Sequence, residues 1–213
     1  PTVLRGILDV MDRTPPPVYV TAVGSPPPRI GQSIRLIGCG GEMFPRELMQ
    51  RARRVAPRVM NNCGPTEVCV LAVWWEAPPG PVITRSLIGR PIANTQVYVL
   101  DSQMQPVPIG TRGVMWVGGM GVTRGYVGMP ERTAKVYRRN PFVDDPEARI
   151  YNTGDVVRYL MDGQLEYLGR NDHQIKLRGF RVELQEIQAC AVEHPTVRAA
   201  HVRAFQGSGG ATR

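Results

Sequence analysis

Residues 156–168 read VVRYLMDGQLEYL, and this stretch gives the clearest indication of the fold. Its two ends are rich in Val, Tyr and Leu, and Val and Tyr are residues that favour strands. The pair Asp162-Gly163 between them is typical of the tight turn that joins two antiparallel strands. The stretch therefore predicts a β-hairpin, with strands at 156–160 and 165–168, and it argues against a bundle of helices.

On both sides of this hairpin, the sequence contains further strand patterns and two helical patterns. Residues 45–56 (PRELMQRARRVA) begin with a Pro that suits the first turn of a helix, and their apolar positions recur on one face. The other predicted helix is 184–193, and a second hairpin is predicted from 174–177 and 180–183. Further strands are predicted at 33–38, 59–60, 68–75, 96–100 and 197–203, and residues 112–125 are predicted as a strand that breaks into a glycine-rich bend. The pattern predicts a strand-rich, mixed α/β fold.

The composition is that of an ordinary globular protein. The chain has 213 residues with 23 Gly and 20 Pro, which indicates many turns, and residues 15–28 form a proline-rich loop. It contains no apolar run of about 18 residues, so we expect no membrane-spanning helix. Four cysteines have neither the spacing of a disulfide framework nor that of a zinc site. We therefore expect a cytoplasmic protein.

The net charge of +8 comes almost entirely from arginine, because only Lys135 and Lys176 are lysines. The arginines are scattered, without the clusters and interleaved aromatic residues of a nucleic-acid surface. A polyphosphate ligand or an acidic partner fits this charge equally well. We therefore expect no nucleic-acid partner and no membrane partner.

The segment NNCGPTE at 61–67 is the first that carries chemistry. Its Gly-Pro pair forces a turn, and Thr66 and Glu67 follow between two apolar runs. Burying these two polar groups is costly unless something pairs with them. A magnesium ion and phosphate oxygens would do so, because this ion prefers oxygen ligands. A plain turn with a solvated Glu67 is the alternative.

Three more segments are distinctive. In YNTGD (151–155), Asp155 follows a glycine at an expected strand start, where its two oxygens can accept hydrogen bonds from a vicinal diol such as ribose. Residues 167–184 combine many charges with two glycines in short strands. The glycine-rich bend at 118–126 lacks the spacing of a P-loop or of a dinucleotide-binding loop, so we interpret it as structural.

In this order and spacing, the segments resemble the adenylate-forming (AMP-binding) superfamily. The similarity is to adenylation domains of nonribosomal peptide synthetases and related carboxylic acid reductases, and it extends over essentially the whole chain. The four motifs that carry it are NNCGPTE, GVMWVGGMGVTRGY, YNTGD and GRNDHQIKLRGFRVELQEIQ. The resemblance implies that 1–171 is the later part of the large adenylation core domain. Residues 172–213 would be the hinge and the beginning of the small α+β C-terminal subdomain.

The resemblance also implies a reaction. A carboxylic acid, which in this family is usually an amino acid, reacts with ATP in the presence of Mg²⁺ to give an acyl-adenylate and pyrophosphate. The acyl group then passes to the phosphopantetheine thiol of a downstream carrier domain. Motif by motif, the implied catalytic residues are Thr66, Glu67 (also the Mg²⁺ ligand) and Lys176; the nucleotide-binding residues are Gly40, Gly41, Glu42, Asn62, Cys63, Asp155, Tyr167 and Arg170; the acyl-pocket residues are Gly38, Gly40, Asn62, Val70 and Leu71; and the hinge is Asp172.

The chain departs from the family pattern in several places, and the pocket segment that normally carries an acidic anchor for an amino group is among those missing. Cys63 stands where the family usually has an aromatic residue, and neither the Ser/Thr/Gly-rich phosphate loop nor the late catalytic lysine is present. We therefore expect a fragment that makes no acyl-adenylate by itself. Two alternatives remain: a piece of a stand-alone acyl- or aryl-CoA ligase, and a degenerate, non-catalytic member that binds nucleotide or serves as a scaffold.

Overall fold

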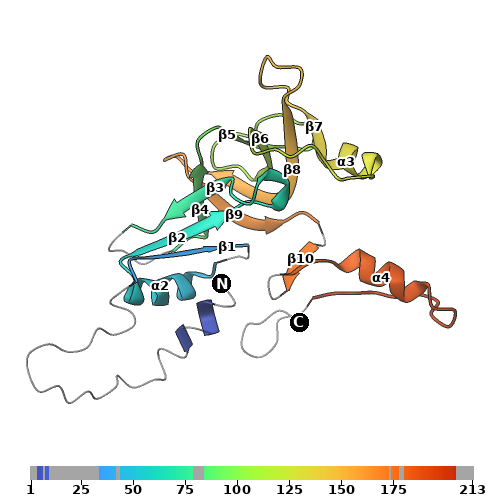
Figure 1. Ribbon diagram of the computed structural model, residues 1–213, viewed down its shortest axis with the longest axis horizontal. Coiled ribbons are helices and arrows are strands. Elements are labelled where there is room, and N and C mark those ends of the chain that lie inside the picture. Colours follow the sequence, from blue (N-terminus) through green and yellow to red (C-terminus); the bar gives the residue numbers. More distant parts are fainter. Residues whose placement is uncertain are drawn as a thin grey trace, which may run out of the picture. The chain divides into compact units, whose positions relative to one another are not determined.

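The structure is a computed structural model that describes residues 4–6, 8–9, 34–41, 44–78, 84–172, 174–177 and 180–204 (Figure 1). The chain divides into two compact units, Pro1–Gly169 and Arg170–Arg213. Among the described residues, the larger unit holds a nine-stranded sheet in the order β1-β2-β3-β4-β9-β8-β6-β5, with β7 paired to β8. The predicted strand-rich, mixed α/β fold is confirmed.

The larger unit consists mainly of strands, with a few short helices between them. They are β1 (Leu36–Gly40), α2 (Arg46–Val55), β2 (Arg58–Cys63), the single 3-10 turn η2 (Thr66–Val68), β3 (Val73–Glu76), β4 (Leu87–Pro91), β5 (Thr95–Leu100), β6 (Gly113–Gly119), α3 (Pro130–Val136), β7 (Tyr137–Arg139), β8 (Arg149–Tyr159) and β9 (Leu165–Arg170). β1 and β2 run parallel, whereas β2 and β3, β5 and β6, and β6 and β8 are antiparallel.

The helix α2 forms where the sequence predicts it. Pro45 precedes it in an extended conformation, and Leu48, Met49 and Ala52 are its buried residues. They pack in one apolar cluster with Val59 of β2, and Figure 1 shows α2 beside β1 and β2. Burial of one face against the sheet stabilises a helix that would be marginal alone at this length.

The central strands carry the main core of the larger unit. Met115 of β6, Tyr151 and Val157 of β8, and Leu165 of β9 are fully buried in one cluster. β8 and β9 are neighbours in the sheet, and the turn between them contains Gly163 with φ of 78°. This left-handed backbone is easy for glycine. The hairpin predicted from 156–168 is confirmed.

The smaller unit begins with a second hairpin. β10 (Gln174–Leu177) and β11 (Phe180–Glu183) pair antiparallel, and α4 (Leu184–Val192) follows. Both were predicted. The strand predicted at 197–203 is wrong: these residues form no regular element, and each is exposed or half-buried. A strand needs a hydrogen-bonded neighbour, and no strand of the described residues pairs with this segment.

Several predicted boundaries differ from the structure. The strand predicted at 68–75 is confined to β3, because the chain first makes the turn η2 and then a loop. The elements α3, β4 and β7 were not predicted, and the proline-rich loop at 15–28 lies outside the described residues. No helix in the described part of the chain is long and apolar enough to cross a membrane.

Candidate functional site

The loop after β2 buries the carboxylate predicted to bind metal. Gly64 and Pro65 leave the strand, Thr66 opens the 3-10 turn and is exposed, and Glu67 is only 7% exposed. A Cβ atom on Gly64 would lie 2.7 Å from the Ala72 nitrogen, so only glycine fits there without a shift. The alternative of a plain turn with a solvated Glu67 is wrong.

The backbone beyond Glu67 is strained. Cys69 has φ of 59° and Val70 has φ of 74°, a region that β-branched residues rarely adopt. Two backbone hydrogen bonds hold the loop in this shape, from Val70 N to Pro65 O (3.0 Å) and from Ala72 N to Cys63 O (3.0 Å). The turn leaves the Val70 side chain 70% exposed, next to a half-buried Leu71. These two residues were predicted to line the acyl pocket, which stays a prediction.

Tyr126 contacts Glu67 directly. Its phenol donates a hydrogen bond to Glu67 Oε1 at 2.6 Å, and Thr123 N donates to the Glu67 backbone carbonyl at 2.9 Å. Burial raises the pKa of the Tyr126 phenol far above its usual value, and the hydrogen bond to Glu67 and the nearby Tyr151 raise it further. Tyr126 was not predicted as a site residue, although it ends the glycine-rich bend that the sequence singled out.

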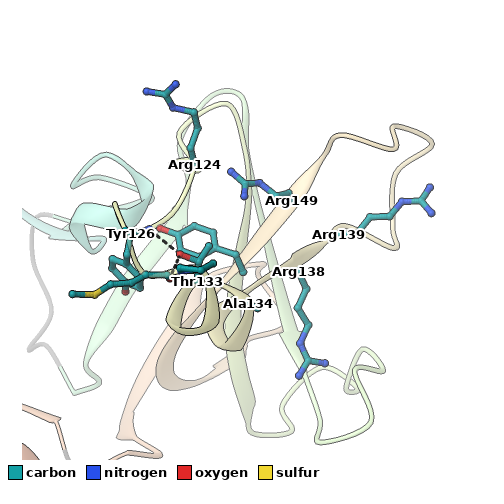
Figure 2. Close-up of a pocket in the computed structure, with 11 residues that line it drawn as sticks. Arg124, Tyr126, Thr133, Ala134, Arg138, Arg139 and Arg149 are labelled. Atoms are coloured by element: carbon teal, nitrogen blue, oxygen red, sulfur yellow. Dashed lines mark hydrogen bonds between the residues drawn. The ribbon is translucent and has the colours of Figure 1, made fainter.

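Tyr126 also lines a hollow of about 460 Å³ near α3 (Figure 2). Arg124, Arg138, Arg139 and Arg149 stand around it, and no salt bridge among the described residues involves any of them. Figure 2 shows the guanidinium groups of Arg124, Arg138 and Arg139 pointing in different directions. The hollow is strongly basic, but these three groups do not converge on one point.

Asp155 lies within a β-bulge. Val156 pairs with Val114 and Asn152 with Trp116, so three residues of β8 face the single residue Met115 of β6. The Thr153 hydroxyl, at the start of the bulge, donates to the Met115 carbonyl at 2.8 Å and accepts from Asp155 N at 3.0 Å.

Gly154, in the middle of this bulge, has φ of 73°, and Asp155 is 8% exposed. Bulges redirect side chains, and here the bulge sets the orientation of a buried carboxylate. The expectation that Asp155 stands at the start of a strand is wrong, since it lies in the middle of β8.

The residues predicted around the base lie on β1, β2 and β9. Gly38 pairs with Met60 and Gly40 with Asn62 between the parallel strands, and Gly41, with φ of 81°, follows β1. A Cβ atom on Gly40 would lie 2.9 Å from the Asn62 carbonyl oxygen, so glycine lets the two strands approach here. Glu42 lies outside the described residues.

Cys63 and Tyr167 are both half-buried against the same core cluster as Val68 and Tyr126. The structure thus brings Cys63, the Glu67 loop, Tyr126 and Tyr167 around one apolar cluster. The nucleotide-binding roles of Cys63 and Tyr167 stay predictions.

Three predicted residues belong to the smaller unit. Arg170 donates two hydrogen bonds to the Asp172 carboxylate, at 2.8 and 2.6 Å. Burial alone would raise the pKa of Asp172, but the hydrogen bond and the charge of Arg170 outweigh burial and hold this pKa below its usual value. Lys176 pairs with Arg181 in the β10–β11 register. The nucleotide, hinge and catalytic roles of these residues stay predictions.

The single buried carboxylate of Glu67 suits a magnesium ion that is shared with a substrate, and it does not suit a metal ion bound by protein side chains alone. The described residues contain no group of three or more His, Cys, Asp or Glu side chains that could hold a metal. Mg²⁺ is commonly bound through one or two carboxylates together with substrate phosphates and water. Glu67 supplies one buried carboxylate, so the residues present fit a magnesium ion that a nucleotide brings with it.

Comparisons with known proteins agree with this geometry. The family described as AMP-binding enzyme matches residues 1–127. A component of the linear gramicidin synthase of Brevibacillus parabrevis is 45% identical over 186 residues, which cover 86% of this chain and 4% of that protein. Malpinin synthetase of Mortierella alpina is 46% identical over 169 residues, which cover 78% of this chain and 2% of that protein.

Solved structures have the same fold. The structure described as holo-PA1221, an NRPS protein containing adenylation and PCP domains bound to a vinylsulfonamide inhibitor, superposes with a TM-score of 0.76 at 26% identity. The match covers 84% of this chain and 31% of that one. The crystal structure of IdnL1 gives a TM-score of 0.73 at 31% identity, covering 82% and 36%. The chain thus spans about a third of these structures and a small fraction of the two synthetases.

Proposed function

Because this chain belongs to the AMP-binding enzyme family, we propose that it forms part of an adenylation domain that activates a carboxylic acid with ATP. The carboxylate oxygen attacks the α-phosphorus, the bond to the bridging oxygen of the β-phosphate breaks, and acyl-AMP and pyrophosphate are formed. A thiol then attacks the acyl carbon and AMP leaves. The observation that carries the proposal is the buried Glu67 carboxylate in its NNCGPTE loop.

Residues of this chain would have roles in both half-reactions. Glu67 would hold the magnesium ion, which neutralises charge on the phosphate oxygens, and Thr66 would contact the phosphates from the exposed edge of the same turn. The bulge in β8 sets the backbone at Asp155. The Asp155 carboxylate would accept hydrogen bonds from the ribose hydroxyls. Arg170 and Tyr167 would lie beside the nucleotide, and Lys176 would act in the thiol step.

The acceptor that we propose is a phosphopantetheine thiol on a carrier domain. Support comes from the similarity to holo-PA1221, which contains adenylation and PCP domains in one protein. The proposed substrate is an amino acid, and the proposed place of action is the cytoplasm. Gly38, Gly40, Asn62, Val70 and Leu71 would form one side of the acyl pocket.

The test is ATP–pyrophosphate exchange with a panel of amino acids and aryl acids, on the natural polypeptide that carries this sequence. Asp155→Asn should weaken nucleotide binding about 10- to 100-fold, because hydrogen bonds to charged groups contribute about 1.5–3 kcal/mol. Asp145→Asn, in an exposed loop, is the matched control. Exchange that stays absent with every acid contradicts the proposal. The 213 residues alone should give no exchange, because they lack the Ser/Thr/Gly-rich phosphate loop.

A further inference from the structure

We infer that Tyr126 is a positioning residue that fixes the Glu67 carboxylate for the metal and the nucleotide. The inference rests on the proposed function, in which Glu67 holds magnesium. Tyr126 is the last residue of the glycine-rich bend at 118–126. The sequence pattern of this bend by itself indicates only a structural element, and the inference gives its last residue a role in the site. Tyr126 itself touches neither substrate nor metal in this scheme, and it acts only through Glu67.

The contact is short and partly withdrawn from water. The phenol oxygen lies 2.6 Å from Glu67 Oε1, and Glu67 is almost fully buried. Hydrogen bonds that an ionised carboxylate accepts are shorter and about twice as strong as neutral ones. A hydrogen bond to Oε1 also selects one rotamer of Glu67. The direction of the second carboxylate oxygen is therefore fixed before any ligand binds.

Tyr126 is itself held firmly enough to do this. Its backbone N–H donates to the Thr133 hydroxyl at 2.9 Å, and that hydroxyl donates to the Met129 carbonyl at 2.9 Å, which ties the segment to the start of α3. Its ring makes an edge contact with Tyr137, with centroids 6.0 Å apart. The Arg132 guanidinium lies 5.1 Å from the centroid of the Tyr126 ring. Figure 2 shows Tyr126 and Thr133 side by side at the hollow.

Gly125 makes this arrangement possible. Its φ is 129°, and a Cβ atom there would lie 2.4 Å from Thr133 Cγ2. Any other residue would push Tyr126 away from Thr133. Because Gly125 allows this close approach, the backbone of Tyr126 is anchored at α3 by a contact that does not involve Glu67.

The Glu67 backbone has a separate anchor. Thr123 N donates to the Glu67 carbonyl, the Thr123 and Tyr137 hydroxyls lie 2.6 Å apart, and Arg149 donates to the Thr123 carbonyl at 3.0 Å. Removal of the Tyr126 hydroxyl therefore leaves the backbone anchor of the loop in place and removes the Tyr126 hydrogen bond from the carboxylate. Tyr126→Phe is thus a selective test of positioning.

The experiment compares the natural polypeptide with its Tyr126→Phe variant. Mn²⁺ binding in the presence of α,β-methylene-ATP is followed by electron paramagnetic resonance, and one site should weaken by about 10- to 100-fold, as is usual when a partner of a metal ligand is removed. In exchange assays, kcat should fall by a similar factor while KM for the carboxylic acid stays within about twofold, because the ground-state contacts of the acid are unchanged.

Tyr98→Phe is the matched control, because it also removes a hydroxyl that a side chain contacts, Asn140 Nδ2 at 3.2 Å. Tyr98→Phe should leave Mn²⁺ binding and kcat unchanged. Unchanged Mn²⁺ binding and kcat in Tyr126→Phe would overturn the inference.

A double variant separates positioning from a general structural effect. If Tyr126 acts only through Glu67, Tyr126→Phe should add little to the loss already caused by Glu67→Gln. Equal losses in the two backgrounds would overturn the inference. If the wild-type protein showed no exchange, the proposed function would fail. A crystal structure of Tyr126→Phe would still test whether Tyr126 positions Glu67: a reoriented Glu67 carboxylate supports positioning, and an unchanged carboxylate refutes it.

Discussion

The Glu67 loop and the Asp155 bulge both hold a buried carboxylate, but different interactions fix them. The bulge is held locally, because Thr153 bonds to Asp155 and to the adjacent strand β6. The Glu67 carboxylate is held by Tyr126, which lies 59 residues further along the chain. The backbone that carries Asp155 therefore depends on the sheet, whereas the Glu67 carboxylate is fixed by a tertiary contact. Three predictions test this difference, from the largest expected effect to the smallest.

The largest effect should come from the strand that carries the bulge. Ile150 of β8 is fully buried and pairs with Gly118 of β6. Ile150→Ala should lower the free energy of unfolding by about 2–5 kcal/mol, the usual cost of truncating a buried aliphatic side chain. Urea unfolding followed by tryptophan fluorescence measures this. Ile109→Ala, at a residue that is 59% exposed, is the control, and equal losses would show that β8 is not the centre of the core.

An intermediate effect should come from the loop. Gly64→Ala places a Cβ atom 2.7 Å from Val70 O and should cost about 1–3 kcal/mol through overpacking. Hydrogen exchange should speed up at the Val70 and Ala72 amides, while the Asp155 amide keeps its protection. Gly38→Ala is the control, since its nearest contact would be an ordinary 3.5 Å. Loss of protection at Asp155 as well would mean that the loop and the bulge are not independent.

The smallest effect is a pH dependence that compares one tyrosine from each region. Burial raises the pKa of Tyr126 at the loop and of Tyr159 on β8, and the neighbouring Tyr98 raises that of Tyr159 further. An unfolded tyrosine has a pKa of about 10. A raised folded-state pKa gives stability that is present below pH 10 and is lost as the pH rises further.

Unfolding free energies at about pH 8 and about pH 11 measure this loss, because the two values bracket the pKa of an unfolded tyrosine. Tyr126→Phe and Tyr159→Phe should each lose less stability between these pH values than the wild-type chain, and Tyr126→Phe should show the larger difference. An equal loss of unfolding free energy between the two pH values in all three proteins would contradict the prediction.

Local patterns predicted much of the fold. The hairpin at 156–168 and the helix at 45–56 were predictable because turn residues and apolar spacing act within a few positions. The family resemblance, drawn from four short motifs, is confirmed by the AMP-binding match over 1–127 and by the similarity to the two peptide synthetases.

Other features depend on distant partners and could not be read locally. The helix α3 was missed because it is short and none of its residues is fully buried, so its sequence carries little apolar periodicity. Val70 belongs to a residue type that favours strands, yet two backbone hydrogen bonds and the close backbone approach that Gly64 allows hold it in a turn. Tyr126 ends the glycine-rich bend, but nothing in the neighbouring sequence indicates a partner at residue 67.

The bulge in β8 also restricts which changes of length this chain tolerates. Two extra residues of β8 stand opposite Met115, so Asn152 and Val156 remain on the same face of the sheet. Deleting two residues there would keep Val157 in the core, whereas deleting one would turn it and every later side chain of β8 to the opposite face. A change of one residue at 153–155 should therefore disturb the core more than a change of two.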